Sequence, residues 1–81
     1  MKKEKKIIIY STPTCIWCRK AKDLLNQNKI RFKDADVSRD HKAAHEMIEK
    51  SGQQGVPVID IDGEVIVGYD EERIKERLHR K

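Results

Sequence analysis

The sequence predicts an α/β fold with four strands in one mixed sheet and helices on both of its faces. A β-branched run, "KKIIIYS", is followed by a helical pattern, and a strand followed by a helix then recurs. A second apolar stretch, "VPVIDIDGEVIV", is divided by Asp62-Gly63, a pair typical of a two-residue hairpin turn. The predicted order is therefore β-α-β-α-β-β-α, with parallel strands across the first helix.

The first half of the chain supplies the strand–helix–strand unit. The run "KKIIIYS" predicts a buried strand that the turn residues "TPT" end. From Cys15 to about Asn28 the apolar residues recur at helical spacing, which places Ala21, Leu24 and Leu25 on one face. The stretch "IRFKDADV" then alternates apolar and polar side chains and predicts the second strand.

A second helix follows, with Ser38 or Asp40 as its N-cap and Gly52 as its C-cap. We expect its inner face to hold Ala44, Met47 and Ile48.

The hairpin follows, with strands over residues 58–62 and 64–69. Asp70 can cap a last helix, and acidic residues in that helix's first turn suit the helix dipole. Ile74 and Leu78 form its apolar face.

The length of 81 residues predicts one domain, 1–81, with basic ends at residues 1–5 and 79–81 that are frayed. The net charge of +4 is partly terminal, and no basic–aromatic motif points to nucleic acid. No apolar run is long enough to span a bilayer, and the start lacks the features of a signal peptide. We therefore expect a cytoplasmic monomer without nucleic acid or membrane partners.

Cys15 and Cys18 are the only two cysteines, and their position matters more than their spacing. Cys15 follows a strand and a proline turn, at the first residues of a helix, where unpaired N–H groups stabilise an anion. A thiolate there is a good nucleophile, and Arg19 and Lys20 add positive charge nearby. Cys18 lies one helical turn on and should be less exposed. We expect Cys15 to attack a substrate disulfide and Cys18 to resolve the mixed disulfide.

Two other interpretations of the cysteines are an inert packed pair and a metal site. They could be inert packed thiols, but packing explains two cysteines at a helix start poorly. They could bind structural zinc with His41 and His45, which lie four residues apart. The gap of about 22 residues between the pairs exceeds the ~12–15 of a zinc finger. Both histidines are better explained as part of a solvated helix face, so we expect no metal ligand.

Two long segments resemble the glutaredoxin family of the thioredoxin fold. They are "IIIYSTPTCIWCRKAKDLL" and "GVPVIDIDGEVIVGYDEE", in the order found in the family, and the likeness runs over roughly residues 6–79. The resemblance implies an oxidoreductase of cell redox homeostasis and electron transport, acting on protein or low-molecular-weight disulfides. It implies no tightly bound cofactor, and it makes glutathione a candidate co-substrate.

The resemblance also implies site residues. Cys15 matches the nucleophile and Cys18 the resolving cysteine of the family. Trp17 occupies a position beside the bound thiol where many members have Tyr. Val56 and Pro57 match the family's Val–cis-Pro, whose backbone would pair with an extended peptide.

The segment Gly68, Tyr69 and Asp70 matches the one that holds the γ-glutamyl end of glutathione in the family. Gln54 lies where that loop carries a basic residue in relatives.

Three positions depart from the family's pattern. Thr12 replaces a frequent Lys, Ile16 a frequent Pro, and Val67 the first Gly of a Gly–Gly pair. These departures weaken the case for glutathione and leave a thioredoxin-reductase-type partner as the other source of electrons. An iron–sulfur cluster bridged between two subunits with glutathione is the remaining alternative.

Overall fold

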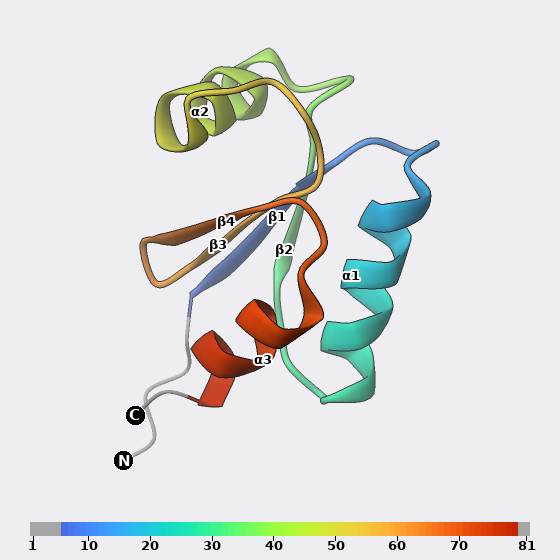
Figure 1. Ribbon diagram of the computed structural model, residues 1–81. Helices are drawn as coiled ribbons and strands as arrows, with labels where there is room; N and C mark the ends of the chain where they lie inside the picture. Colours follow the sequence, from blue (N-terminus) through green and yellow to red (C-terminus); the bar gives the residue numbers. More distant parts are fainter. Residues whose placement is uncertain (1–5, 80–81) are drawn as a thin grey trace.

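The computed structural model describes residues 6–79 and confirms the predicted order of elements (Figure 1). The elements are β1 (Ile7–Ser11), α1 (Ile16–Gln27), β2 (Lys33–Asp36), α2 (His41–Ser51), β3 (Val58–Ile61), β4 (Glu64–Val67) and α3 (Glu71–His79). The four strands form one sheet in the order β2-β1-β3-β4. Strands β1 and β2 are parallel, and the other two neighbouring pairs are antiparallel. Within residues 6–79, no helix has the length and apolar character needed to cross a membrane.

One row of paired residues crosses the whole sheet close to the end of β1. Tyr10 pairs with Ala35 of β2 and with Val58 of β3, and Val58 pairs with Val67 of β4. The end of β1, the start of β3 and the end of β4 therefore lie at the same edge of the sheet. The segments that leave this edge are the ones that carry the predicted site.

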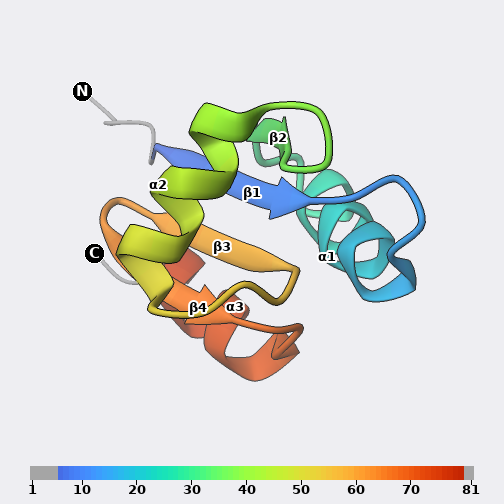
Figure 2. The ribbon, with the colours of Figure 1, turned by 90° about the horizontal axis from the view of Figure 1, so that it is seen from above.

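Helices cover both faces of the sheet, as predicted. Helices α1 and α3 lie on one face and α2 on the other, as Figure 2 shows from above. Alternate strand residues point to opposite faces, so Ile7 and Ile9 pack under α1 and α3, whereas Tyr10 packs under α2. All four residues of β3 are buried, as a central strand covered on both faces requires.

The buried face of α2 differs from the one expected from the sequence. Ala43 and Met47 are the buried residues, whereas Ile48 is 39% exposed and Ala44 only half-buried. Ala43 and Met47 are four residues apart and so share one face of the helix. The prediction that Met47 faces inward is confirmed, and the prediction for Ala44 and Ile48 is wrong because the buried face is rotated by one residue.

Strand β2 is also shorter than residues 30–37. Ile30 and Phe32 precede the paired residues and pack beside the core under α1 and α3. The hairpin strands end at Ile61 and Val67, earlier than expected. The expectation of frayed ends falls outside the described residues, except at residue 79, where α3 ends.

The predicted caps and the hairpin turn are confirmed. The Asp40 carboxylate accepts the Ala43 N–H at 3.1 Å and starts α2, and Gly52 ends that helix with φ 74°. Asp62 and Gly63 have φ of 51° and 91°, as a two-residue turn of type I′ requires.

A partly buried polar network fixes α2 to the sheet. The Lys50 ammonium donates to Asp60 Oδ2 at 2.7 Å and to the Tyr10 hydroxyl at 2.8 Å. Asp60 is only 7% exposed, and its other oxygen accepts the Gly63 N–H at 2.7 Å. Partial burial lowers the pKa of Lys50, but its bonds to Asp60 and Tyr10 together outweigh this effect and raise that pKa above its usual range. No local pattern in the sequence predicts this network, because its three residues are far apart along the chain.

Candidate active site

Cys15 caps the N-terminus of α1, and its sulfur lies against the first turn of the helix. The residue has an extended backbone, with φ −85° and ψ 113°. Its Sγ accepts the Cys18 N–H at 3.1 Å, and its own N–H donates to the Thr12 carbonyl at 3.3 Å. A cap position of this kind offers backbone N–H groups and the positive end of the helix dipole to an anion. The side chain is half-buried and therefore accessible to a disulfide.

Cys18 is buried and is 1% exposed. Burial, followed by the hydrogen bond to the Cys15 sulfur, raises the pKa of Cys18 to about 12; a bond to the Thr12 backbone lowers it only in part. Both cysteines are free thiols. The two side chains thus differ in access, and Cys18 is held in its protonated form at neutral pH.

An aromatic pair lies beside Cys15. The rings of Trp17 and Tyr69 stack with centroids 5.9 Å apart and an interplanar angle of 27°. Trp17 remains 54% exposed, as expected for a contact surface, and the Lys20 ammonium lies 4.7 Å from its ring centroid. The sequence indicated the two aromatic residues but not their contact, because 51 positions separate them along the chain.

The segment before α3 joins the proline loop to the last helix. The Gly68 N–H donates to the Pro57 carbonyl at 2.8 Å, and Gly68 has φ 83°, a region that suits glycine. The Asp70 carboxylate accepts the Arg73 N–H at 3.1 Å, which confirms its predicted capping role. The cap therefore already uses one of the N–H groups expected to bind a ligand carboxylate.

Charged residues follow at the same helix start. The Tyr69 hydroxyl donates to Glu71 at 3.1 Å, and Glu71 pairs with Lys75 at 3.0 Å. Lys75 and then the Tyr69 hydrogen bond lower the pKa of Glu71. Partial burial, followed by Glu71, raises the pKa of Tyr69.

The loop before β3 has the predicted cis bond between Val56 and Pro57. Pro57 is buried and Val56 half-buried, and the pairing of Val58 with Tyr10 holds the start of β3 beside the end of β1. Gln54 is exposed. Its neighbour Gln53 turns into the loop instead, which the sequence "SGQQG" could not reveal.

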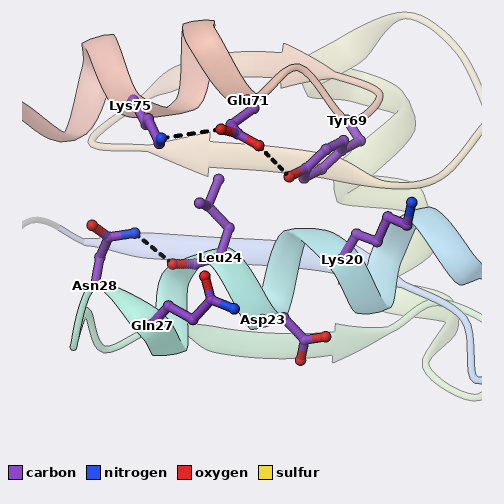
Figure 3. A pocket seen from close by; sticks show the side chains of 8 residues that line it. All are labelled: Lys20, Asp23, Leu24, Gln27, Asn28, Tyr69, Glu71 and Lys75. Carbon is purple, nitrogen blue, oxygen red and sulfur yellow. Dashed lines mark hydrogen bonds and ion pairs between the residues drawn. The ribbon is translucent and has the colours of Figure 1, made fainter.

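A groove of about 510 Å³ runs between α1 and α3 (Figure 3). Its lining residues are Lys20, Asp23, Leu24, Gln27, Asn28, Tyr69, Glu71 and Lys75. The two cysteines therefore lie outside the lining of this groove.

The two histidines considered as metal ligands lie on α2, across the sheet from α1 (Figure 2). His45 instead pairs with Glu49 at 3.1 Å on an exposed face. Within residues 6–79, no group of three or more His, Cys, Asp or Glu side chains is arranged to hold a metal ion. The helix that Cys15 caps and the helix that carries both histidines thus lie on opposite faces of the sheet.

Comparison with known proteins agrees with this geometry. The family model described as glutaredoxin matches residues 7–66. A glutaredoxin-like 8.6 kDa protein from the rubredoxin operon of Clostridium pasteurianum is 47% identical over 91% of this chain and 99% of its own length. Glutaredoxin 3 of Escherichia coli is 36% identical over 78% of this chain and 76% of its own. The crystal structure of the thioredoxin-like protein BC3987 superposes with a TM-score of 0.86 at 30% identity, covering 90% of this chain and 100% of its own.

Proposed function

Because the chain belongs to the glutaredoxin family, we propose that it reduces disulfides of proteins or small molecules through Cys15 and Cys18. The family carries thiol–disulfide oxidoreductase activity. The observation that supports these two residues as its agents is the contrast between the half-buried, helix-capping Cys15 and the buried Cys18 one turn away.

The proposed reaction is a pair of thiol–disulfide exchanges. The Cys15 thiolate attacks one sulfur of the substrate disulfide, forms a mixed disulfide and releases the first substrate thiolate. Cys18 then loses its proton and attacks the Cys15 sulfur, which releases the second substrate thiolate. The substrate gains two electrons, and after protonation two thiols, while the protein is left with a Cys15–Cys18 disulfide.

The arrangement of the two sulfurs supports this order of attack. Cys15 can be reached from solvent and Cys18 cannot, so the first exchange belongs to Cys15. The short contact between the Cys18 N–H and the Cys15 sulfur keeps the second thiol next to the bond that it must break. A high pKa for Cys18 keeps it from competing for the substrate.

The source of the two returning electrons is glutathione or a thioredoxin-reductase-type flavoprotein. Thr12 offers no cation for a glutathione carboxylate, and the exposed Val67 side chain replaces the hydrogen of a glycine. We infer that these positions favour the protein reductant. Turnover of the oxidised protein with NADPH and thioredoxin reductase, compared with glutathione and its reductase, distinguishes the two sources.

The proposal is tested by reduction of insulin disulfides with the wild-type protein and with Cys15→Ser, dithiothreitol serving as electron donor in both. Wild type should accelerate the reduction, and the variant should lose that acceleration because no other accessible sulfur can form the mixed disulfide. The exposed His45→Gln on α2 serves as the control and should retain full activity. Full activity of Cys15→Ser would refute the assignment.

A further inference from the structure

We propose that Gln53 is a positioning residue: its side-chain amide closes the loop before Pro57 and holds the Val56 backbone ready to pair with a polypeptide substrate. This inference rests on the proposed function. It concerns a residue outside the Cys-x-x-Cys motif, and it narrows the preferred substrate to disulfides carried by peptide chains.

The carboxamide of Gln53 bonds the backbone of Gly55 on both sides. Its Oε1 accepts the Gly55 N–H at 2.6 Å, and its Nε2 donates to the Gly55 carbonyl at 2.9 Å. An amide is the side chain that can do both at once, since one end accepts and the other donates. Residues 53–55 are thereby tied into a closed turn that leads directly into Val56.

Ser51 anchors this turn to the end of α2. Its hydroxyl contacts the Met47 carbonyl at 2.6 Å and the Gln53 carbonyl at 3.0 Å, and it accepts the Gln53 N–H at 3.3 Å. Met47 is 2% exposed and belongs to the core under α2. The closed turn is therefore tied at its start to a residue of the buried core.

The other end of the loop is fixed as well. Val58 pairs with Tyr10 and Val67, and the Pro57 carbonyl accepts the Gly68 N–H at 2.8 Å. Between these fixed points, the backbone N–H and carbonyl of Val56 make no hydrogen bond with any of residues 6–79. Unpaired backbone groups next to the start of a strand are what a peptide needs to pair with a polypeptide backbone.

Gly55 provides a second way to displace the Gln53 amide from the turn. A Cβ atom at this position would lie 2.7 Å from Gln53 Oε1, closer than side-chain atoms approach. Gly55 does not have a positive φ, so alanine fits its backbone. Gly55→Ala should therefore act by pushing the Gln53 amide out of the turn, and it should have no such effect once that amide is gone.

The experiment is a cycle of Gln53→Ala, Gly55→Ala and the double variant, assayed with insulin and with 2-hydroxyethyl disulfide. Without the amide, fewer molecules hold the Val56 backbone in the position that pairs with a peptide. Binding of insulin is weakened by that fraction, so its KM should rise about fivefold at unchanged kcat. The KM for 2-hydroxyethyl disulfide, which has no peptide groups, should not change. The double variant should equal Gln53→Ala alone. Asn26→Ala, which removes an exposed carboxamide of α1, should match wild type.

Additional readouts separate positioning from loss of fold or of thiol reactivity. The rate of Cys15 alkylation by iodoacetamide should be the same in all variants. If Gln53→Ala does not fold, Gln53→Glu replaces it; this exchange keeps the acceptor for the Gly55 N–H, loses the donor, and should raise the insulin KM by a smaller factor. Equal rises for both substrates, an unchanged insulin KM, or additive effects in the double variant would overturn the proposal. A wild type that reduces neither disulfide would instead refute the proposed function.

Discussion

Two sulfur atoms one helical turn apart have different surroundings, and the difference comes from the helix. Cys15, as the cap, precedes the first turn and stays half-buried, whereas Cys18 points into the protein and is 1% exposed. Burial raises the pKa of Cys18 to about 12, so its thiol stays protonated at neutral pH. One motif thereby supplies an accessible thiol and a protected one.

The raised pKa of Cys18 predicts how its alkylation depends on pH. In Cys15→Ser, burial of Cys18, the main cause of the shift, remains. Because the thiolate fraction below the pKa grows with pH, the iodoacetamide rate should rise about tenfold for each pH unit. The rise should continue through pH 10, as measured by mass spectrometry on quenched samples. A rate that stops rising near pH 9, the ordinary pKa of a cysteine thiol, would show that Cys18 is not protected.

The positions of site residues were predictable where a local motif marks them and not where a contact within the folded loop decides them. Cys15, Cys18 and Asp70 could be placed from the sequence because strand, turn and helix starts have local signals. Gln53 and Gln54 are chemically identical neighbours, and only the direction of each side chain distinguishes them. That direction depends on the loop as a whole and left no trace in the sequence.

Among the elements, α2 determines where the proline loop begins. Its inner residues Ala43 and Met47 are small or flexible, so apolar packing alone is modest. The bonds of Lys50 to Asp60 and Tyr10 add a polar connection between the last turn of α2 and two strands. Removal of the cation beside a buried carboxylate lowers the free energy of unfolding, because the carboxylate is left buried without a partner.

Lys50→Met should therefore destabilise the fold by about 2 kcal/mol, because it leaves Asp60 buried without its cation. Urea unfolding followed by circular dichroism measures this as a lower midpoint at unchanged slope. Lys42→Met, an exposed position of the same helix, is the matched control and should change the midpoint little. A Lys50→Met midpoint equal to that of the control would show that the network adds nothing to stability.

The type and order of the elements followed from the sequence, but the inner face of α2 did not. Its apolar residues are few, and Ala43, Ala44, Met47 and Ile48 allow two faces one residue apart. The bonds of Lys50 to the sheet agree with the face that buries Ala43 and Met47. This information comes from long-range contacts with Asp60 and Tyr10, which no local pattern contains.

At the scale of the whole molecule, the sheet separates two groups of polar and reactive side chains. One edge gathers the end of β1, the start of β3 and the end of β4, and so brings Cys15, Pro57 and Gly68 to the same end of the molecule. The other face of the sheet carries α2, with its exposed histidines, and the bonds of Lys50 to Asp60 and Tyr10. The topology thus explains why residues 15 and 57 can serve one site although they are distant in sequence.

The central claim is that Cys15 forms the covalent link to substrate and Cys18 releases it. The most direct measurement is the intact mass of reduced Cys18→Ser after incubation with native insulin, whose disulfides are intact, followed by peptide mapping. The account predicts a mixed disulfide at Cys15 that persists until reductant is added, whereas wild type accumulates only its internal disulfide. Absence of the adduct in Cys18→Ser, or an adduct of the same yield at Cys18 in Cys15→Ser, would contradict it.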